Sequence, residues 1–275
     1  MDVKLYIPPP ALQPYVLNIL TVDATLPEGI SEVVTPYPPS PFQSLMFYCN
    51  DAVAMGRPGS DQFDLQPLVL LTGPQFSRVN VKVHRALRSV RIDFLPGAVY
   101  RILGIPMQEM FDGGYDAIDF FGTEMKSLHA ELQHTPDLEK CKTLVENFFI
   151  KQITSAREIL PFDAAMRLLL LQDGNMSIEK AASLSCLSTR QLERKCNERL
   201  GMNPKMYSRI LRFSKAYRLH ESFPQSSWTS VAHEAGYYDQ MHMIRDFKLF
   251  AGVNPSVIEQ QLLETPLRMQ KDMRY

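Results

Sequence analysis

A duplicated ending constrains this chain more than any other feature of its sequence. One stretch begins at Gly236 and ends in Gly-Val-Asn-Pro, and 51 residues earlier another ends in Gly-Met-Asn-Pro at positions 201–204. Shifted by 51 residues, the two segments align without a gap, and Arg194 then matches Arg245, seven residues before each glycine. A repeat of this kind predicts that one small structural unit is used twice.

Each copy of the repeat has the pattern of two short helices joined by a tight turn. The small residues Ala181 and Ala232 occupy equivalent positions in the first helix, where they allow another helix to approach closely. Ser188 and Asp239 are capping residues for the second helix, and a glycine ends it. This is the plan of a helix-turn-helix, whose second helix reaches base edges in the major groove. We place the two units at residues 177–204 and 228–255.

The segment between the two copies is amphipathic and basic. It predicts a helix of about 17 residues, about 25 Å long, which Pro204 opens. That length suits two reading helices in successive major grooves, which lie about 34 Å apart. Residues 188–218 contain nine basic and two acidic residues, although the whole chain has a net charge of −1. Such a local positive field favours a polyanion as partner.

The first half of the chain alternates short apolar runs with proline and glycine turn signals. The runs at 44–49 and 68–71 predict buried strands. Period-2 alternation at 79–83 and 90–94 predicts half-buried antiparallel strands, the second with Arg91 and Asp93 on the face opposite its apolar residues. Strands of this kind indicate a small barrel or sandwich.

Helical periodicity follows the strands. Between residues 124 and 152, apolar residues recur at helical spacing, and Pro136 divides the region into two helices. Their apolar faces have three uses open to them: packing on the β unit, packing on each other, or packing across a dimer. Strands first and helices afterwards predict an α+β chain of two domains. We expect a β-rich domain at 1–122, a helical linker region at 123–160 and an all-α domain at 161–275.

Cysteine spacing and hydropathy limit the classes of protein to which the chain can belong. The four cysteines form no CxxC pair and no Cys/His metal spacing, which indicates buried thiols in a reduced, cytoplasmic protein. No run of 18 apolar residues occurs, so we expect no membrane span.

Residues 161–262 resemble the AraC/XylS family of bacterial transcription regulators. The second copy fits the family pattern G-F-x-D-x-S-x-F-x-R-x-F-K-x-x-x-G-x-x-P, from which Tyr237, Met241 and Met243 depart. Residues 73–112 look like the regulatory half of one branch of the family. The resemblance implies an N-terminal cupin-like antiparallel β-barrel that senses a small molecule or mediates homodimer formation. It also implies double-stranded DNA and RNA polymerase as partners, with activation as the expected mode.

Resemblance and position together assign the DNA contacts. Arginine can bond guanine, glutamine can pair with adenine, glutamate can accept from cytosine, and methionine can touch a thymine methyl group. The expected base contacts are Arg190, Glu193, Arg194, Gln240, Met241, His242 and Arg245. Phosphate contacts position a protein without specifying sequence, and the candidates are Ser188, Lys195, Arg199, Lys205, Arg209, Arg212, Lys215, Asp239 and Lys248. The alternative for each charged residue is an internal ion pair or a solvated face.

A DNA-binding regulator is therefore the leading hypothesis, and two others stay open beside it. A cupin-type metal enzyme with a helical appendage needs a cluster of histidines and carboxylates, and the β region contains no H-x-H or H-x-x-x-H motif. We accordingly expect no metal site, no cofactor and no catalytic residue. A helical protein–protein adaptor predicts that Arg190 and Arg245 are dispensable for DNA binding.

Overall fold

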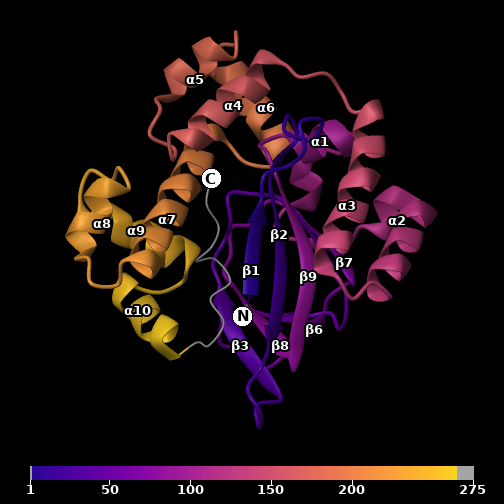
Figure 1. Cartoon of the computed structure of the whole chain (residues 1–275). Helices are drawn as coiled ribbons and strands as arrows, with labels where there is room; N and C mark the ends of the chain where they lie inside the picture. The colour runs from indigo at the N-terminus through magenta and orange to yellow at the C-terminus, as the bar shows by residue number, and fades with distance from the viewer. Residues whose placement is uncertain (1, 265–275) are drawn as a thin grey trace.

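The computed structural model describes residues 2–264, with residues 259 and 261–264 described by their backbone alone (Figure 1). A β-rich half comes first in the chain and a helical half follows, which confirms the predicted α+β class. No helix among the described residues is long and apolar enough to cross a membrane.

The strands form two antiparallel sheets that do not join into one closed barrel. The first sheet has the order β1-β2-β9-β4-β7-β10 and the second has the order β3-β8-β5-β6. The strands of the first sheet are β1 (Asp2–Tyr6), β2 (Val16–Thr25), β9 (Ala86–Phe94), β4 (Ser44–Tyr48), β7 (Val69–Thr72) and β10 (Gly114–Asp116). Those of the second are β3 (Glu32–Tyr37), β8 (Val79–His84), β5 (Ala54–Gly56) and β6 (Asp64–Leu65). Of the two shapes that the alternation allowed, the sandwich describes this pairing better than the barrel.

The predicted half-buried character of β9 is wrong, because the second sheet covers its polar face. Arg91 is 5% exposed and Asp93 is fully buried. The guanidinium of Arg91 donates to Asp93 over 2.7 Å, to the hydroxyl of Tyr37 over 2.7 Å and to that of Ser44 over 2.9 Å. Buried charges need such partners, because an unpaired charge between two sheets would cost several kcal/mol.

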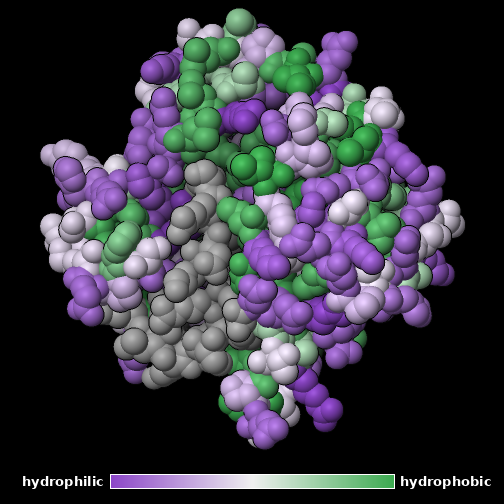
Figure 2. Space-filling model, in the orientation of Figure 1, coloured by the Kyte–Doolittle hydropathy of each residue, from purple (hydrophilic) through white to green (hydrophobic). Residues whose placement is uncertain are grey.

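Two helices cover the other face of the first sheet. They are α2 (Ile118–Gln133) and α3 (Leu138–Gln152), separated at Pro136 as predicted. The apolar face of α3 packs on the sheet, where the ring of Phe149 lies 5.9 Å edge-on to that of Phe94. In the view of Figure 2, the outer surface over α2 and α3 is mainly hydrophilic. Packing on the β unit and on each other is therefore the use that these two apolar faces have within the chain.

The helical half contains the repeat as two helix pairs around one long helix. The helices are α4 (Pro161–Leu171), α5 (Ile178–Leu184), α6 (Thr189–Leu200), α7 (Pro204–Ser222), α8 (Trp228–Glu234), α9 (Gln240–Phe250) and α10 (Pro255–Glu264). Helix α7 lies between the pair α5–α6 and the pair α8–α9 (Figure 1). Phe213 of α7 anchors the second pair, because its ring lies 5.0 Å from that of Phe247 and 5.2 Å from that of Phe250.

The shared Gly-x-Asn-Pro ending has a local physical reason. Gly201 takes the left-handed conformation that ends α6, with φ at +75°, and Gly252 does the same after α9, with φ at +72°. Asn203 caps α7, since its side-chain oxygen accepts from the backbone N–H of Met206 over 2.9 Å. Pro204 then supplies the first residue of the helix, where its missing N–H is of no consequence.

The two halves pack directly on one another through a short segment of the β-rich half. The 3-10 helix η1 (Met107–Met110) lies against the end of α6. Helix α1 (Ala98–Leu103) also contacts α6. A Cβ added at Gly201 would lie 2.9 Å from the carbonyl oxygen of Met107 and 2.6 Å from Pro74. One continuous hydrophobic core extends through both halves. The position of α6 is thus coupled to the β-rich half.

Candidate nucleic-acid interface

Helix α6 has one buried face and one exposed face, as a recognition helix requires. Leu192 and Cys196 are fully buried against the rest of the unit. Arg190, Glu193 and Arg194 are exposed on the opposite face. Helix α6 begins with the predicted capping box, in which the N–H of Gln191 donates to the Ser188 hydroxyl and the N–H of Ser188 donates to the Gln191 side chain. Its start is therefore fixed, and the exposed stripe begins within its first turn.

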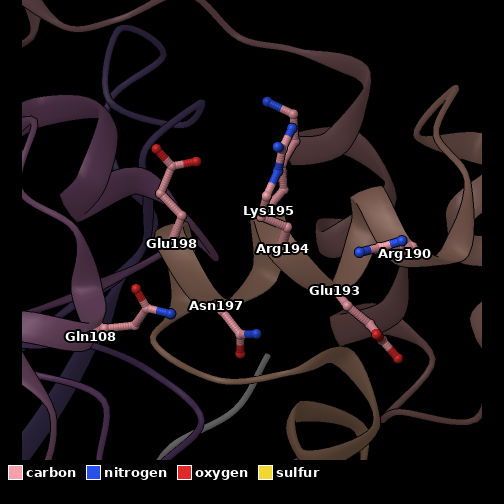
Figure 3. Close-up of a pocket in the computed structure, with 7 residues that line it drawn as sticks. All are labelled: Gln108, Arg190, Glu193, Arg194, Lys195, Asn197 and Glu198. Atoms are coloured by element: carbon pink, nitrogen blue, oxygen red, sulfur yellow. The ribbon is translucent and has the colours of Figure 1, made fainter.

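The exposed face of α6 borders an open concavity of about 620 Å³. Figure 3 shows the basic side chains of α6 on one side of it and Gln108 of η1 on the other, with the Gln108 amide pointing toward Asn197. The lining residues are Gln108, Arg190, Glu193, Arg194, Lys195, Asn197 and Glu198. The structure thus brings all three predicted base contacts of the first unit together.

Three lining residues were missed by sequence reasoning: Gln108, Asn197 and Glu198. Glu198 accepts a hydrogen bond from the hydroxyl of Tyr100 over 2.9 Å, a contact between the two halves of the chain. Asn197 lies seven residues after Arg190 and three after Arg194, so helical periodicity alone could have found it. Gln108 lies in the other half of the chain, and only the packing of η1 on α6 brings it near. No local signal in the sequence indicates such a contact.

The second unit places its predicted contacts at the start of α9. Asp239 caps α9 by accepting from the backbone N–H of His242 over 2.8 Å, and its carboxylate also lies 2.8 Å from Nδ1 of that imidazole. The backbone hydrogen bond, followed by the one from the imidazole, lowers the pKa of Asp239 from its ordinary value. Gln240 is held by the hydroxyl of Thr229, which donates to its side-chain oxygen over 2.8 Å. Met241, His242, Arg245 and Lys248 are exposed.

The predicted phosphate contacts divide into exposed and internally bonded residues. Ser188, Lys205, Asp239 and Lys248 are exposed, and Lys195 is half-buried. Arg199 points inward instead: it is 7% exposed, pairs with Asp163 over 3.4 Å and lies over the rings of Tyr100 and Phe162. The prediction that Arg199 contacts phosphate is therefore wrong, because α4 and α1 cover it.

Three basic residues of α7 bond to neighbouring elements of the helical half. Arg209 donates to Oδ1 of the buried Asp246 in α9 over 3.0 and 2.7 Å. Arg212 donates to the carbonyl of Gly174 over 2.8 Å. Lys215 pairs with Asp173 over 3.0 Å. These contacts give the three residues a bracing role, and their contact with phosphate stays a prediction.

The positive field of the region is smaller than its sequence indicates. Of the nine basic residues in 188–218, four pair with carboxylates of the chain: Arg199, Arg209, Lys215 and Arg218. Burial lowers the pKa of Arg218 to about 9. The other five are Arg190, Arg194 and Lys195 on α6, Lys205 at the start of α7, and Arg212, which bonds a backbone carbonyl. The three on α6 and Lys205 lie close in sequence, along α6 and just after it, which is where a polyanion would be attracted.

The described residues contain no group of three or more His, Cys, Asp or Glu side chains arranged to hold a metal ion. Among the buried tyrosines, Tyr237 donates its hydroxyl to Asp246 over 3.2 Å, and burial raises its pKa. Tyr237 and Asp246 are therefore engaged in a structural pair.

Two family models match different parts of the chain. Residues 181–261 match a family model described as a helix-turn-helix domain, and residues 4–116 match one described as a domain of unknown function. No curated protein matches the chain. The helix-turn-helix match covers most of both copies of the repeat and the helix that joins them, so the helix-turn-helix assignment rests on sequence and on geometry together.

Several solved structures show a weaker similarity. An apo variant of ToxT from Vibrio cholerae strain SCE256 is 12% identical over 89% of this chain and 97% of its own, with a TM-score of 0.47. Wild-type ToxT from the same strain, bound to an unsaturated fatty acid, is 11% identical over 88% of this chain and 100% of its own, with a TM-score of 0.46. A probable AraC family transcriptional regulator from Rhodopseudomonas palustris CGA009 is 22% identical over 36% of this chain and 97% of its own, with a TM-score of 0.32. Because these TM-scores lie below 0.5, the similarities alone do not establish a shared fold.

Proposed function

We propose that this chain is a DNA-binding transcription regulator with a double helix-turn-helix domain like that of the AraC/XylS family, and that α6 and α9 read two successive major grooves on one face of the duplex. The observation that carries the proposal is the duplicated unit on either side of α7. Helix α7 has 19 residues, so it is about 28 Å long at 1.5 Å per residue. Successive major grooves on one face are about 34 Å apart.

Within this arrangement, the exposed residues of α6 and α9 specify the site. Arg190, Glu193 and Arg194 contact bases of the first half-site. Gln240, Met241, His242 and Arg245 contact bases of the second. Apart from the half-buried Gln240, these residues are exposed, and both sets lie in the first half of their helices, where a recognition helix meets base edges. The two sets share only the arginine, so the site for one chain is asymmetric.

A second group of residues positions the protein on the backbone. Lys195, Lys205 and Lys248 supply charge, while Ser188 and the first backbone N–H groups of α6 lie at a helix start that suits a phosphate. The carboxylate of Asp239, whose pKa is lowered, would repel a phosphate, so its role is to cap α9. Arg209, Arg212 and Lys215 act through α7 by fixing the angle between the two units. An error in that angle would misplace one recognition helix while the other stays in its groove.

The β-rich half, at residues 1–122, acts in this proposal as the regulatory domain, with residues 123–160 as its linker. A small-molecule effector or a second copy of the chain would act on it, and the packing of η1 on α6 gives its state a route to the first recognition helix. Activation through RNA polymerase, in the cytoplasm of a bacterium, is the mode that the family resemblance favours.

The test is a mobility shift of the full chain with its own promoter region across a salt series. Neutralising about five phosphates should reduce affinity about hundredfold or more between about 50 and 200 mM salt. Binding that is sequence-independent, or insensitive to salt, would contradict the proposal. The adaptor alternative predicts instead that the double variant Arg190→Ala, Arg245→Ala binds the promoter as the wild type does.

A further inference from the structure

The exposed stripe of α9 begins one residue before the helix cap, at Tyr238. Tyr238, Met241, His242 and Arg245 follow the spacing i, i+3, i+4 and i+7. The side chain of Tyr238 is 93% exposed and that of Met241 is 59% exposed. Two large, mainly apolar side chains are thus exposed at the start of a proposed recognition helix, one just before its cap and one in its first turn.

Tyr238 makes an aromatic contact with His242 although it is exposed. Its ring lies 6.0 Å from the imidazole of His242 at an interplanar angle of 88°, an edge-on contact. That imidazole is itself fixed by its 2.8 Å contact with the carboxylate of Asp239. The aromatic ring therefore lies beside the first turn of α9, next to the exposed side chain of His242.

The first unit differs at the equivalent positions. Fifty-one residues before Tyr238, Met241 and Arg245 the chain has Leu187, Arg190 and Arg194. Leu187 is partly buried and packs on the core of its own unit. The stripe of α6 therefore offers two guanidinium groups, whereas that of α9 offers a phenol ring, a thioether chain and one guanidinium group.

Major-groove chemistry connects these stripes with different bases. Guanine presents two acceptors, N7 and O6, which suit arginine, whereas the C5-methyl group of thymine is the apolar group on a base edge. We propose, as an extension of the DNA-reading function above, that Tyr238 and Met241 select thymine by enclosing its C5-methyl group. The half-site under α9 is then thymine-containing, and the half-site under α6 is guanine-containing.

The test compares thymine with uracil, which lacks only that methyl group. Sequences bound by the full-length wild type are first selected from a randomised duplex library. The thymines of the α9 half-site are then replaced by uracil, one at a time. For at least one position, we expect the wild type to bind about fourfold more weakly, which corresponds to the ~0.8 kcal/mol of one buried methyl group.

Variants identify the side chains that sense the methyl group. Tyr238→Ala and Met241→Ala should each remove most of the thymine-over-uracil preference at one position, whereas Tyr238→Phe should keep it. Leu249→Ala is the matched control, because Leu249 is also an exposed apolar residue of α9 but lies near its far end; it should leave the preference unchanged. Thermal melts should coincide for the Tyr238 variants, because the exposed ring contributes little to the fold.

Other outcomes would overturn either the DNA-reading function or the thymine inference. If selection with the wild type enriches no sequence, the proposed DNA-reading function fails. If a sequence is enriched but uracil binds as well as thymine at every position, the thymine inference alone is overturned. It is also overturned if Tyr238→Phe loses as much affinity as Tyr238→Ala on every duplex, since the hydroxyl would then be bonding phosphate. Selection that returns no thymine in the α9 half-site has the same consequence.

Discussion

At the scale of single residues, we expect Arg245 and Lys248 to have different roles although both side chains are positively charged. Both are exposed on α9, one turn apart. We expect Arg245→Ala to cost about 1–3 kcal/mol on the preferred duplex and to relax specificity at one position. Lys248→Ala should weaken all duplexes equally and reduce the salt slope by about 1. Titration of specific and non-specific duplexes at several salt concentrations measures both. Equal losses on both duplexes for Arg245→Ala would make it a phosphate contact.

Asp239 gives a prediction about pH. Hydrogen bonds from His242 lower its folded-state pKa below the value of about 3.9 in an unfolded chain. A carboxylate whose folded pKa is lowered stabilises the fold fully above the unfolded value and loses that contribution as pH falls through the folded value. Asparagine also caps helices but does not titrate. The free energy of unfolding of the wild type, measured against that of Asp239→Asn, should therefore decline below about pH 4. A difference that is constant from pH 7 to pH 2 would contradict this.

At the scale of elements, the sequence predicts the helices of the repeat better than the roles of the charges on them. Caps and helix ends depend on neighbours a few residues away, so Ser188, Asp239 and Gly201 could be assigned from the sequence. The partner of Arg209 is Asp246, 37 residues further along the chain, and that of Arg199 is Asp163 on another helix. Such pairs depend on how helices pack, which residue spacing along one helix does not determine.

The pairing of α7 with α9 can be tested through Arg209. Asp246 is 5% exposed, so Arg209→Met would leave a buried carboxylate without its charge partner. We expect a loss of about 2 kcal/mol, less than the ~3–5 kcal/mol of a fully buried pair, because the Arg209 side chain remains 31% exposed. Lys215→Met is the control. Lys215 and its partner Asp173 are both partly exposed to solvent, so the loss of this ion pair should cost under about 1 kcal/mol. Denaturant unfolding measures both, and equal losses would remove the bracing role of Arg209.

At the scale of the whole molecule, the packing of one element on another determines which polar residues are buried. Local sequence patterns do not predict this. Alternation along β9 predicts its strand, and the strand forms, but the second sheet buries Arg91 and Asp93 between the layers. The concavity beside α6 likewise includes Gln108 because the β-rich half packs on the helical half. The order of strands in the two sheets and the contact between the halves both join residues distant in sequence, and one sequence carries little signal for either.

Two equivalent glycines test the contact between the halves. Gly201 and Gly252 have nearly the same left-handed φ, so alanine should cost about 1–2 kcal/mol of backbone strain at either position. A Cβ at Gly252 would meet no atom within 4 Å, whereas one at Gly201 would press on Pro74 and Met107. Gly201→Ala should therefore raise hydrogen exchange in η1 and the end of α6, and Gly252→Ala should not. Identical exchange in the two variants would mean that this packing does not depend on Gly201.

The central claim is that two helix-turn-helix units of one chain read two major grooves. Hydroxyl-radical footprinting of the full chain on its selected duplex tests it most directly. We predict two protected segments on one face of the DNA, centred about 10 base pairs apart, with Arg194→Ala losing protection in one segment and Arg245→Ala losing it in the other. A single protected segment, or the same segment weakened by both variants, would contradict the claim.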